Sequence, residues 1–397
     1  VLLSDEPCLI ENLPNISDVA TLLKTMHSLG AQIKPINKSS VEIDPRHVNS
    51  FVVTKKMAEG MRASSYFLGA LLGRMQRARV APPGGCDFGV RPIDQHIKGF
   101  EALGAKMAIE NGMVDAKAQH LTGCSIYLDV VSVGATINIM LAAVKASGLT
   151  VIENAAREPH IVDLANFLNS MGADIMGAGT SVIKIRGVKH MHGTSYSIIP
   201  DQIEAGTYMA AAVATRGDVL VTNVTPKHLE SIIAKLVETG AKVTEYDEAV
   251  RVQMTRRPHK CNIKTMPHPG FPTDMQPQIA VLLSIAEGTS IITEGVWDSR
   301  FRYVEQLTLM GADIQVDGKM AVITGVEELH SSPVRAVDLR AGAAMIIAGL
   351  IADGVTEIEE IDHIDRGYED VVEKFSGLGA DIKRVNVPDN VPILKQA

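Results

Sequence analysis

The chain has 397 residues, of which 46% are hydrophobic and 21% are charged, a composition typical of a folded globular protein rather than a disordered or fibrous one. A net charge of −8 and an aromatic content of 4% argue against a nucleic-acid partner, because a basic surface and stacking rings are both scarce. The apolar runs at 137–144 and 279–285 are far shorter than the roughly 20 residues that span a bilayer, so we expect no membrane partner.

The cysteines and the first residues of the sequence indicate the cellular compartment in which the protein is expected. Cys8, Cys86, Cys124 and Cys261 lie far apart without a CxxC pair, which argues against a disulfide framework or a zinc site. The pair His190 and His192 has no third metal ligand spaced nearby. Because the first residues also lack a basic region followed by an apolar core, the sequence predicts a cytoplasmic protein in a reducing compartment without a metal.

One pattern recurs along the whole chain, beginning at Leu29-Gly30-Ala31. In each copy an amphipathic segment ends at a glycine that is followed by alanine and a short apolar run. This pattern predicts a helix that ends at a left-handed glycine and continues into a strand. The glycines are Gly30, Gly104, Gly172, Gly240, Gly311 and Gly379, spaced by 74, 68, 68, 71 and 68 residues. Six similar units are therefore expected.

A second series of glycines confirms the phase of these units. Each closes an alanine-rich apolar segment and precedes β-branched residues; they are Gly148, Gly217, Gly288 and Gly354. Because the apolar segments are hydrophobic nearly all round, they predict helices buried inside sheets. We expect an α/β protein of two domains, residues 1–199 and 200–397, with three units in each. The first unit begins only 29 residues before Gly30, so its opening strand and apolar helix are expected to be missing.

The loop 82–92 holds one cysteine and one arginine among glycines and prolines. Its glycines free the backbone in the middle while its prolines stiffen both ends, which predicts a mobile lid. Arg91 could favour the thiolate of Cys86, or hold an anionic substrate beside the thiol. The alternative for Cys86 is a small buried hydrophobic residue.

Charged residues stand at the starts of several expected helices. Asp274, in Pro272-Thr273-Asp274, is either a catalytic base or a helix N-cap that stabilises by about 1 kcal/mol. Arg62 and Arg340 stand at equivalent helix starts, although a cation there opposes the helix dipole by a few tenths of a kcal/mol. They indicate either anionic ligands or a solvated surface.

Five motifs, in this order and spacing, resemble one family from end to end. They are 83–86 with 91–96, Ser132-Val133-Gly134-Ala135-Thr136, 154–159, 271–276 and 363–368. The chain is similar to the UDP-N-acetylglucosamine 1-carboxyvinyltransferases, the enolpyruvyl transferases of peptidoglycan synthesis, in the second-copy form of low-GC Gram-positive bacteria.

The resemblance implies two inside-out α/β domains, each of three repeated units, with the active site between them. It also implies a reaction in which the sugar 3′-hydroxyl attacks phosphoenolpyruvate, a tetrahedral intermediate forms and phosphate leaves, without a metal or organic cofactor. The substrates would be UDP-N-acetylglucosamine and phosphoenolpyruvate, and fosfomycin would be an inhibitor.

Roles follow from the same resemblance. Cys86 would donate a proton and form a covalent adduct, and Asp274 would accept the proton of the sugar hydroxyl. Arg91 and Arg366 would hold the phosphate, and Arg300 and Arg340 the carboxylate. The nucleotide sugar would contact Arg62, Arg91, Pro92, Ile93, Asp94, Gln95, Val130, Val131, Ser132, Val133, Gly134 and Val296.

Two alternatives stay open from the sequence. The family carries a Lys-Asn pair near its N-terminus, in the part of the first unit that this sequence lacks, so one alternative is a catalytically impaired nucleotide-sugar binder. The other is a shikimate-pathway enolpyruvyl transferase, which Cys86 and Asp94 argue against. Smaller departures are Val130, where some members carry lysine, and His160, where some carry glutamate.

Overall fold

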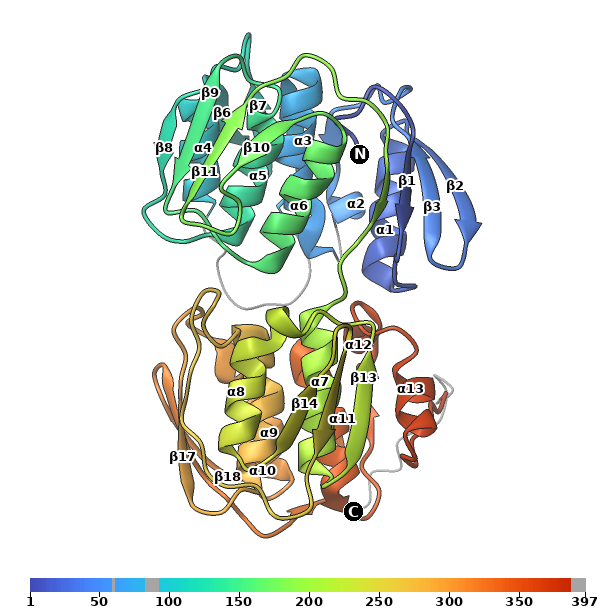
Figure 1. Cartoon of the computed structure of the whole chain (residues 1–397), viewed down its shortest axis with the longest axis vertical. Helices are drawn as coiled ribbons and strands as arrows, with labels where there is room; N and C mark the ends of the chain where they lie inside the picture. Colours follow the sequence, from blue (N-terminus) through green and yellow to red (C-terminus); the bar gives the residue numbers. More distant parts are fainter. Residues whose placement is uncertain (59–60, 83–92, 387–397) are drawn as a thin grey trace.

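The computed structural model describes residues 1–58, 61–82 and 93–386, without the side chain of Arg62. Figure 1 shows two lobes stacked along the long axis. Buried side chains form two separate hydrophobic clusters, one from Leu2 to Met191 and one from Ile203 to Phe375. We call these parts the first and the second lobe. The domain boundary between residues 199 and 200 stays a prediction, and the two clusters support it.

The first lobe contains three four-stranded sheets with one common order. In each, an edge strand runs parallel to its neighbour and the other two pairings are antiparallel. The first sheet comprises β12 (Ser195–Ser197), β1 (Cys8–Glu11), β3 (Ser40–Asp44) and β2 (Gln32–Asn37). The second comprises β4 (Val52–Val53), β5 (Arg77–Val80), β7 (Met113–Lys117) and β6 (Lys106–Glu110). The third comprises β8 (Ser125–Tyr127), β9 (Leu149–Glu153), β11 (Val182–Arg186) and β10 (Asp174–Met176).

The helices of the first lobe are α1 (Ser17–Ser28), α2 (Lys55–Ala58), η1 (Arg62–Ser65), α3 (Tyr66–Met75), α4 (Asp94–Ala102), α5 (Val133–Ala143) and α6 (Pro159–Ser170). In the described part of this lobe no apolar helix precedes β1. The place of the expected opening strand is taken by β12, which comes from the other end of the lobe and pairs in parallel with β1. The sequence did not predict this return of the chain, because it joins segments almost 190 residues apart.

The second lobe repeats the unit with less regular sheets. Its helices are α7 (Gln202–Ala214), η2 (Pro226–Leu229), α8 (Glu230–Glu238), η3 (Thr273–Met275), α9 (Gln276–Ser284), η4 (Arg300–Tyr303), α10 (Val304–Leu309), α11 (Leu339–Ile351), α12 (Asp362–Asp365) and α13 (Val371–Gly377). One sheet comprises β13 (Asp218–Thr222), β15 (Ala249–Gln253) and β14 (Lys242–Glu245). Another comprises β16 (Ile263–Lys264), β17 (Thr289–Thr293), β19 (Met320–Thr324) and β18 (Asp313–Asp317). Two short pairs join β20 (Leu329–His330) to β22 (Ala352–Asp353) and β21 (Val334–Arg335) to β23 (Ile358–Glu359).

The apolar helices lie inside, as the sequence predicted. All nine residues of α9 are buried, and so are most residues of α5, α7 and α11. In the second lobe α7, α9 and α11 contact one another, and in the first lobe α3 contacts α5. The close approach of α3 to α5 needs Gly69, because a Cβ there would lie 2.3 Å from the carbonyl oxygen of Asn138. Within the described residues, no helix combines the length and the apolar character that crossing a bilayer requires.

The glycines that marked the repeat have the predicted conformation. All six glycines of the Gly-Ala series have positive φ angles, between 88° and 109°. The second series differs at one copy: Arg216, with a φ of 56°, takes the left-handed position there in place of Gly217. The fold is therefore two inside-out α/β lobes built from repeated units.

Candidate active site

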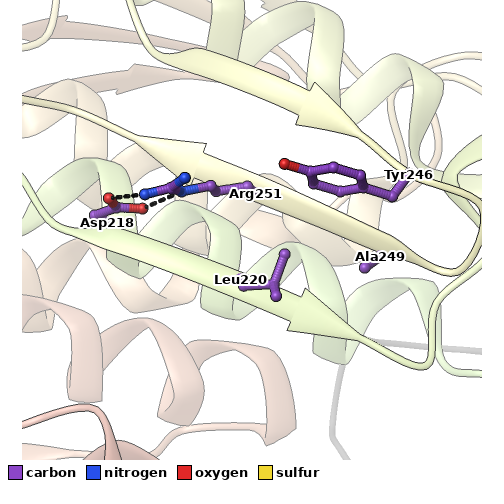
Figure 2. A pocket seen from close by; sticks show the side chains of 5 residues that line it. All are labelled: Asp218, Leu220, Tyr246, Ala249 and Arg251. Carbon is purple, nitrogen blue, oxygen red and sulfur yellow. Dashed lines mark hydrogen bonds and ion pairs between the residues drawn. The ribbon is translucent and has the colours of Figure 1, made fainter.

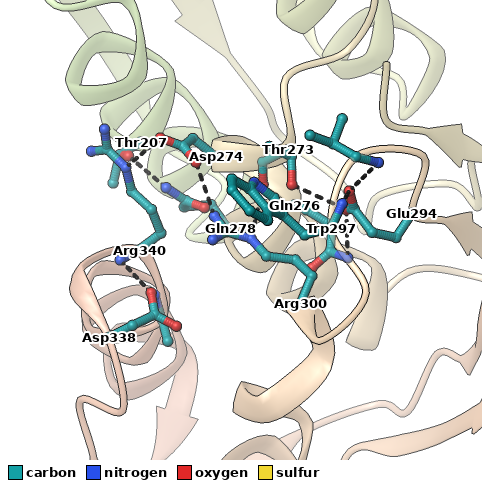
Figure 3. Close-up of polar contacts among 12 residues, drawn as sticks. Thr207, Thr273, Asp274, Gln276, Gln278, Glu294, Trp297, Arg300, Asp338 and Arg340 are labelled. Carbon is teal, nitrogen blue, oxygen red and sulfur yellow. Dashed lines mark hydrogen bonds and ion pairs between the residues drawn. The ribbon is translucent and has the colours of Figure 1, made fainter. Parts of the chain in front are cut away.

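Asp274 lies in the short helix η3, which leads directly into α9. Arg300 Nη2 donates to its Oδ1 at 3.2 Å, and Arg340 Nε donates to its Oδ2 at 3.3 Å. The Arg300 side chain is only 1% exposed, whereas that of Asp274 is 31% exposed. Figure 3 shows the carboxylate between side chains that come from η4 and α11. A buried cation and a half-buried one thus hold a carboxylate that solvent and ligands can reach.

The alternative that Asp274 is a helix N-cap is wrong. Neither η3 nor α9 has a side-chain capping hydrogen bond, so the carboxylate stabilises no helix start. The contrast is Asp338, whose Oδ1 accepts hydrogen bonds from the backbone N–H groups of Arg340 and Ala341 and so caps α11. Asp274 instead directs its charge at the two arginines.

Arg340 has N–H donors that are not used by the described protein groups and could bind a ligand. Its Nε is used by Asp274 and its Nη1 donates to the Tyr368 hydroxyl at 3.3 Å. A guanidinium has five N–H donors, and Nη2 of Arg340 has no acceptor among the described residues. Its side chain is 13% exposed. Planar donors of this kind bind carboxylates in a bidentate manner.

Glu294 is a buried contact residue of the candidate site that the sequence analysis missed. It follows β17 and is 1% exposed. Its carboxylate accepts from Thr273 Oγ1 at 3.1 Å, Gln276 Nε2 at 3.2 Å and the backbone N–H groups of Val296 and Trp297 at 2.8 and 3.0 Å. Four donors compensate a buried charge that would otherwise be strongly destabilising. Glu294 thereby ties η3, which carries Asp274, to the loop that carries Val296 (Figure 3).

Arg366 joins the two lobes. It lies directly after α12 and is 8% exposed, and its Nε and Nη2 donate to the two carboxylate oxygens of Asp18 at 2.9 and 3.1 Å. Asp18 belongs to the first turn of α1, in the first lobe. A second link is the backbone N–H of Asn15, which donates to Glu369 at 2.6 Å. The carboxylate of Asp18 therefore lies where an anionic ligand of Arg366 would bind.

Two segments of the first lobe meet at Gln95. Its Oε1 accepts from the backbone N–H of Asp129 at 2.9 Å, and its Nε2 donates to the side chains of Asp94 and Asp129 at 2.9 and 3.1 Å. These bonds bring the start of α4 beside the loop that leads into α5. Ser132 caps α5 by accepting from the N–H of Ala135 at 3.3 Å. Val130 is 58% exposed, so its side chain is available for contact with a ligand.

Comparison with known proteins agrees with this architecture. Residues 1–375 match the family described as EPSP synthase (3-phosphoshikimate 1-carboxyvinyltransferase). The structure is similar to that of the enolpyruvyl transferase NikO from Streptomyces tendae, with a TM-score of 0.88 and 26% identity over 98% of this chain and 92% of that one. It also matches EPSP synthase from Acinetobacter baumannii with a TM-score of 0.73, but at 18% identity, which shows the fold alone.

Curated relatives are much more similar in sequence. UDP-N-acetylglucosamine 1-carboxyvinyltransferase 3 of Caldanaerobacter subterraneus subsp. tengcongensis is 57% identical over 384 residues, which are 97% of this chain and 92% of the relative. The UDP-N-acetylglucosamine 1-carboxyvinyltransferase of Clostridium botulinum is 54% identical over 385 residues, with the same coverage of 97% and 92%. The chain belongs to the UDP-N-acetylglucosamine 1-carboxyvinyltransferase family. The shikimate-pathway alternative is therefore not favoured.

The structure gathers the residues that the family resemblance singled out into two groups. In the second lobe Arg300 and Arg340 each contact Asp274, and Val296 is linked to η3 through Glu294. Ile93, Asp94 and Gln95 lie beside the segment from Val130 to Gly134 in the first lobe. Arg366 contacts Asp18 of the first lobe. Cys86, Arg91, Pro92 and the side chain of Arg62 lie outside the described residues.

Two further features of the described residues add nothing to the candidate active site. Among the described residues, no group of three or more His, Cys, Asp or Glu side chains could hold a metal ion. A shallow hollow on the outer surface of the β13 and β15 sheet is lined by Asp218, Leu220, Tyr246, Ala249 and Arg251 (Figure 2). Its charges already compensate each other, because Arg251 Nη2 and Nε donate to the two oxygens of Asp218.

Proposed function

We propose that this chain transfers the enolpyruvyl group of phosphoenolpyruvate to the 3′-hydroxyl of UDP-N-acetylglucosamine, the first committed step of peptidoglycan synthesis. The hydroxyl oxygen bonds to C2 of phosphoenolpyruvate while C3 gains a proton, which gives a tetrahedral intermediate. The C2–O bond to phosphate then breaks and C3 loses a proton, so that inorganic phosphate and enolpyruvyl-UDP-N-acetylglucosamine are released. The names of relatives that are more than half identical to this chain support the choice of substrates.

The observation that carries the proposal is the carboxylate of Asp274 between Arg300 and Arg340. The two guanidiniums hold the carboxylate in place, while its exposed part can receive a ligand hydroxyl. When the carboxylate of phosphoenolpyruvate engages donors of the same guanidiniums, it shares their charge with Asp274. Asp274 then accepts the proton of the sugar 3′-hydroxyl as a general base.

We assign the nucleotide sugar to the first lobe. Ile93, Asp94 and Gln95 lie beside the segment from Val130 to Gly134, because Gln95 forms hydrogen bonds with Asp129, which directly precedes that segment. Arg62, Pro92 and Val296 complete this assignment by family resemblance. Cys86 would protonate C3 and react with fosfomycin, and Arg91 would bind phosphate beside it. A lid that closes on the nucleotide sugar and a cytoplasmic location stay predictions.

Arg366 is assigned to the phosphate of phosphoenolpyruvate. Its Nε and Nη2 donate to Asp18 of the first lobe in this structure. Phosphate carries more charge and more acceptor oxygens than one carboxylate, so it can replace Asp18 at the guanidinium. Binding of this substrate is therefore coupled to the contact between the lobes.

The experiment is a phosphate-release assay with mass analysis of the nucleotide sugar. With both substrates, the purified chain should release phosphate and convert UDP-N-acetylglucosamine to its enolpyruvyl ether in equal amounts. Shikimate 3-phosphate in place of the nucleotide sugar should give no phosphate. Phosphate release from phosphoenolpyruvate with shikimate 3-phosphate, but not with UDP-N-acetylglucosamine, would overturn the substrate assignment. Binding of UDP-N-acetylglucosamine without any phosphate release would support the alternative of an inactive nucleotide-sugar binder.

A further inference from the structure

The hydroxyl of Tyr368 joins the three helices that form the interior of the second lobe. Tyr368 is only 2% exposed. Its hydroxyl oxygen lies 2.9 Å from Thr207 Oγ1 on α7, 3.3 Å from Gln278 Nε2 on α9 and 3.3 Å from Arg340 Nη1 on α11. Each buried helix thus contributes one polar side chain, and one of the three is the guanidinium beside Asp274.

The direction of these hydrogen bonds follows from the chemistry of the groups. A guanidinium only donates, so Arg340 donates to the Tyr368 oxygen. The Thr207 hydroxyl donates to the carbonyl of Ile203 at 2.8 Å, which leaves it as the acceptor of the Tyr368 proton. Burial raises the pKa of the Tyr368 hydroxyl, so it is protonated at neutral pH. A continuous chain of donors therefore runs from Arg340 through Tyr368 and Thr207 to the backbone of α7.

Other buried tyrosines of this lobe show that burial alone does not provide a tyrosine hydroxyl with hydrogen-bond partners. The hydroxyls of Tyr208 and Tyr303 are buried and have no hydrogen-bond partner among the described residues. Tyr208 is the neighbour of Thr207 on α7 and provides a matched control. Tyr368 differs from both in that its lone pairs and its proton are all used.

Two contacts define the plane of the Arg340 guanidinium. Asp274 accepts from Nε, and Tyr368 accepts from Nη1 with its ring centroid 5.5 Å from Cζ. Without the hydroxyl, Asp274 would be the only side chain among the described residues that accepts a hydrogen bond from Arg340, and the ring contact alone would not fix rotation about the Cδ–Nε bond. We propose that Tyr368 is a positioning residue that aligns Arg340, through the Thr207 and Gln278 hydrogen bonds, to receive the carboxylate of phosphoenolpyruvate. This inference rests on the proposed function for the identity of the ligand.

The kinetic test is Tyr368→Phe in the full chain. Loss of a hydrogen bond to a charged group should raise KM for phosphoenolpyruvate about tenfold or more. We expect kcat and KM for UDP-N-acetylglucosamine to stay within about twofold, because Tyr368 contacts neither Asp274 nor the first lobe in the contacts described. Tyr208→Phe should leave all three parameters unchanged. Thr207→Val, which removes the acceptor of the Tyr368 proton, should raise the same KM by a smaller factor of about threefold.

Equal behaviour of Tyr368→Phe and Tyr208→Phe would overturn the inference. So would a Tyr368→Phe protein in which kcat and both KM values deteriorate together, since that pattern indicates a structural role alone. If Tyr368→Phe does not fold, the Thr207→Val variant decides by the same criterion.

A second readout separates this inference from the proposed function. In the NMR spectrum of the wild-type chain, the guanidinium Nε–H signal of Arg340, assigned by its loss in Arg340→Lys, should be sharp. In Tyr368→Phe it should broaden or move, and in Tyr208→Phe it should not. This result is expected whether or not the chain turns over phosphoenolpyruvate. An unchanged Arg340 signal in Tyr368→Phe would overturn the positioning role even in an active enzyme.

Discussion

The two lobes share one architecture but use their arginines in different ways. In the first lobe, Arg74 donates to the backbone carbonyls of Leu2, Ser4 and Pro45, each at 2.8 Å. In the second lobe, Arg300 and Arg340 face the carboxylate of Asp274. Carbonyl groups are fixed parts of the chain, whereas a side-chain carboxylate can share its cations with an incoming anion. The same residue type is therefore structural in one lobe and available for chemistry in the other.

The polar groups buried between the helices also differ in charge between the two lobes. In the first lobe, Asn138 on α5 accepts from the backbone N–H of Gly69 on α3 at 2.8 Å and contacts His96 Nδ1 at 3.0 Å. Burial lowers the pKa of His96 to about 4, so this group is neutral at pH 7. In the second lobe, the corresponding set around Tyr368 ends at a cation. The polar set between the buried helices is thus neutral in the first lobe and includes a cation in the second.

Among the variants that compare the two lobes, the largest expected effect comes from exchanging one arginine in each lobe. Arg340→Gln should lower kcat/KM for phosphoenolpyruvate by about 100- to 1,000-fold, because a partner of a buried charge interaction is lost. Arg74→Gln should leave kcat/KM within about twofold and instead lower the free energy of unfolding by about 1–3 kcal/mol, because three carbonyls lose a donor. Steady-state kinetics and urea unfolding of both variants check this. Equal kinetic losses in the two variants would remove the distinction between the lobes.

The neutral histidine of the first lobe predicts a dependence of stability on pH. The pKa of His96 is lowered from 6.5 to about 4 on folding, so the unfolded chain binds a proton more readily than the folded one. The contribution of His96 is complete above about pH 6.5 and falls as the pH drops toward 4, by up to about 3 kcal/mol. Urea unfolding at pH 7 and at pH 4.5 should show a smaller difference for His96→Gln than for the wild type. The same difference in both proteins would contradict a buried neutral histidine.

A smaller effect is expected where the lobes meet. Asp18→Asn removes the charge that competes for Arg366, so KM for phosphoenolpyruvate should fall by about threefold to tenfold and inorganic phosphate should inhibit more strongly. The matched control is Glu369→Gln, which weakens another described link between the lobes, to Asn15, and leaves Arg366 in place. If Glu369→Gln improves the affinity equally, looser lobes rather than competition explain the change. An increase in KM on Asp18→Asn would contradict the competition.

The smallest effect concerns a hydroxyl of the second lobe that has no described role. Tyr303→Phe removes a buried oxygen without a partner among the described residues. Its free energy of unfolding should be unchanged or higher by less than about 1 kcal/mol, because no hydrogen bond is lost. Thermal and urea unfolding provide the measurement. A loss of more than about 1 kcal/mol would show that buried hydroxyls in this lobe matter irrespective of their partners.

The repeat could be predicted because each unit is coded locally. A left-handed glycine, an apolar helix and a β-branched strand each need only neighbouring residues, so Gly30 and Gly379 have the predicted conformation despite lying in different lobes. The return of β12 to the first sheet could not be predicted in this way, because it depends on how the finished units close on one another.

The candidate site was predictable in its charged residues but not in its contacts. Asp274 and Arg340 stood out as charges before apolar helices, and the family resemblance supplied their roles. Asp18 has the pattern of an ordinary acidic residue in a first helical turn, and its partner Arg366 is 348 residues away. Glu294 follows a strand without any special spacing. Such pairs are determined by packing between units, and a local periodic pattern in the sequence does not predict that packing.

The central claim is that Asp274, held by Arg300 and Arg340, accepts the proton in an enolpyruvyl transfer. The most direct test compares phosphate release by the wild type, Asp274→Asn and Asp218→Asn at saturating phosphoenolpyruvate and UDP-N-acetylglucosamine. Asp218 also pairs with an arginine, but on the outer surface of the β13 and β15 sheet. The account predicts that Asp274→Asn lowers kcat by about 10²- to 10⁴-fold in a folded protein, while Asp218→Asn leaves it unchanged. Turnover by Asp274→Asn at the rate of the wild type would contradict the account.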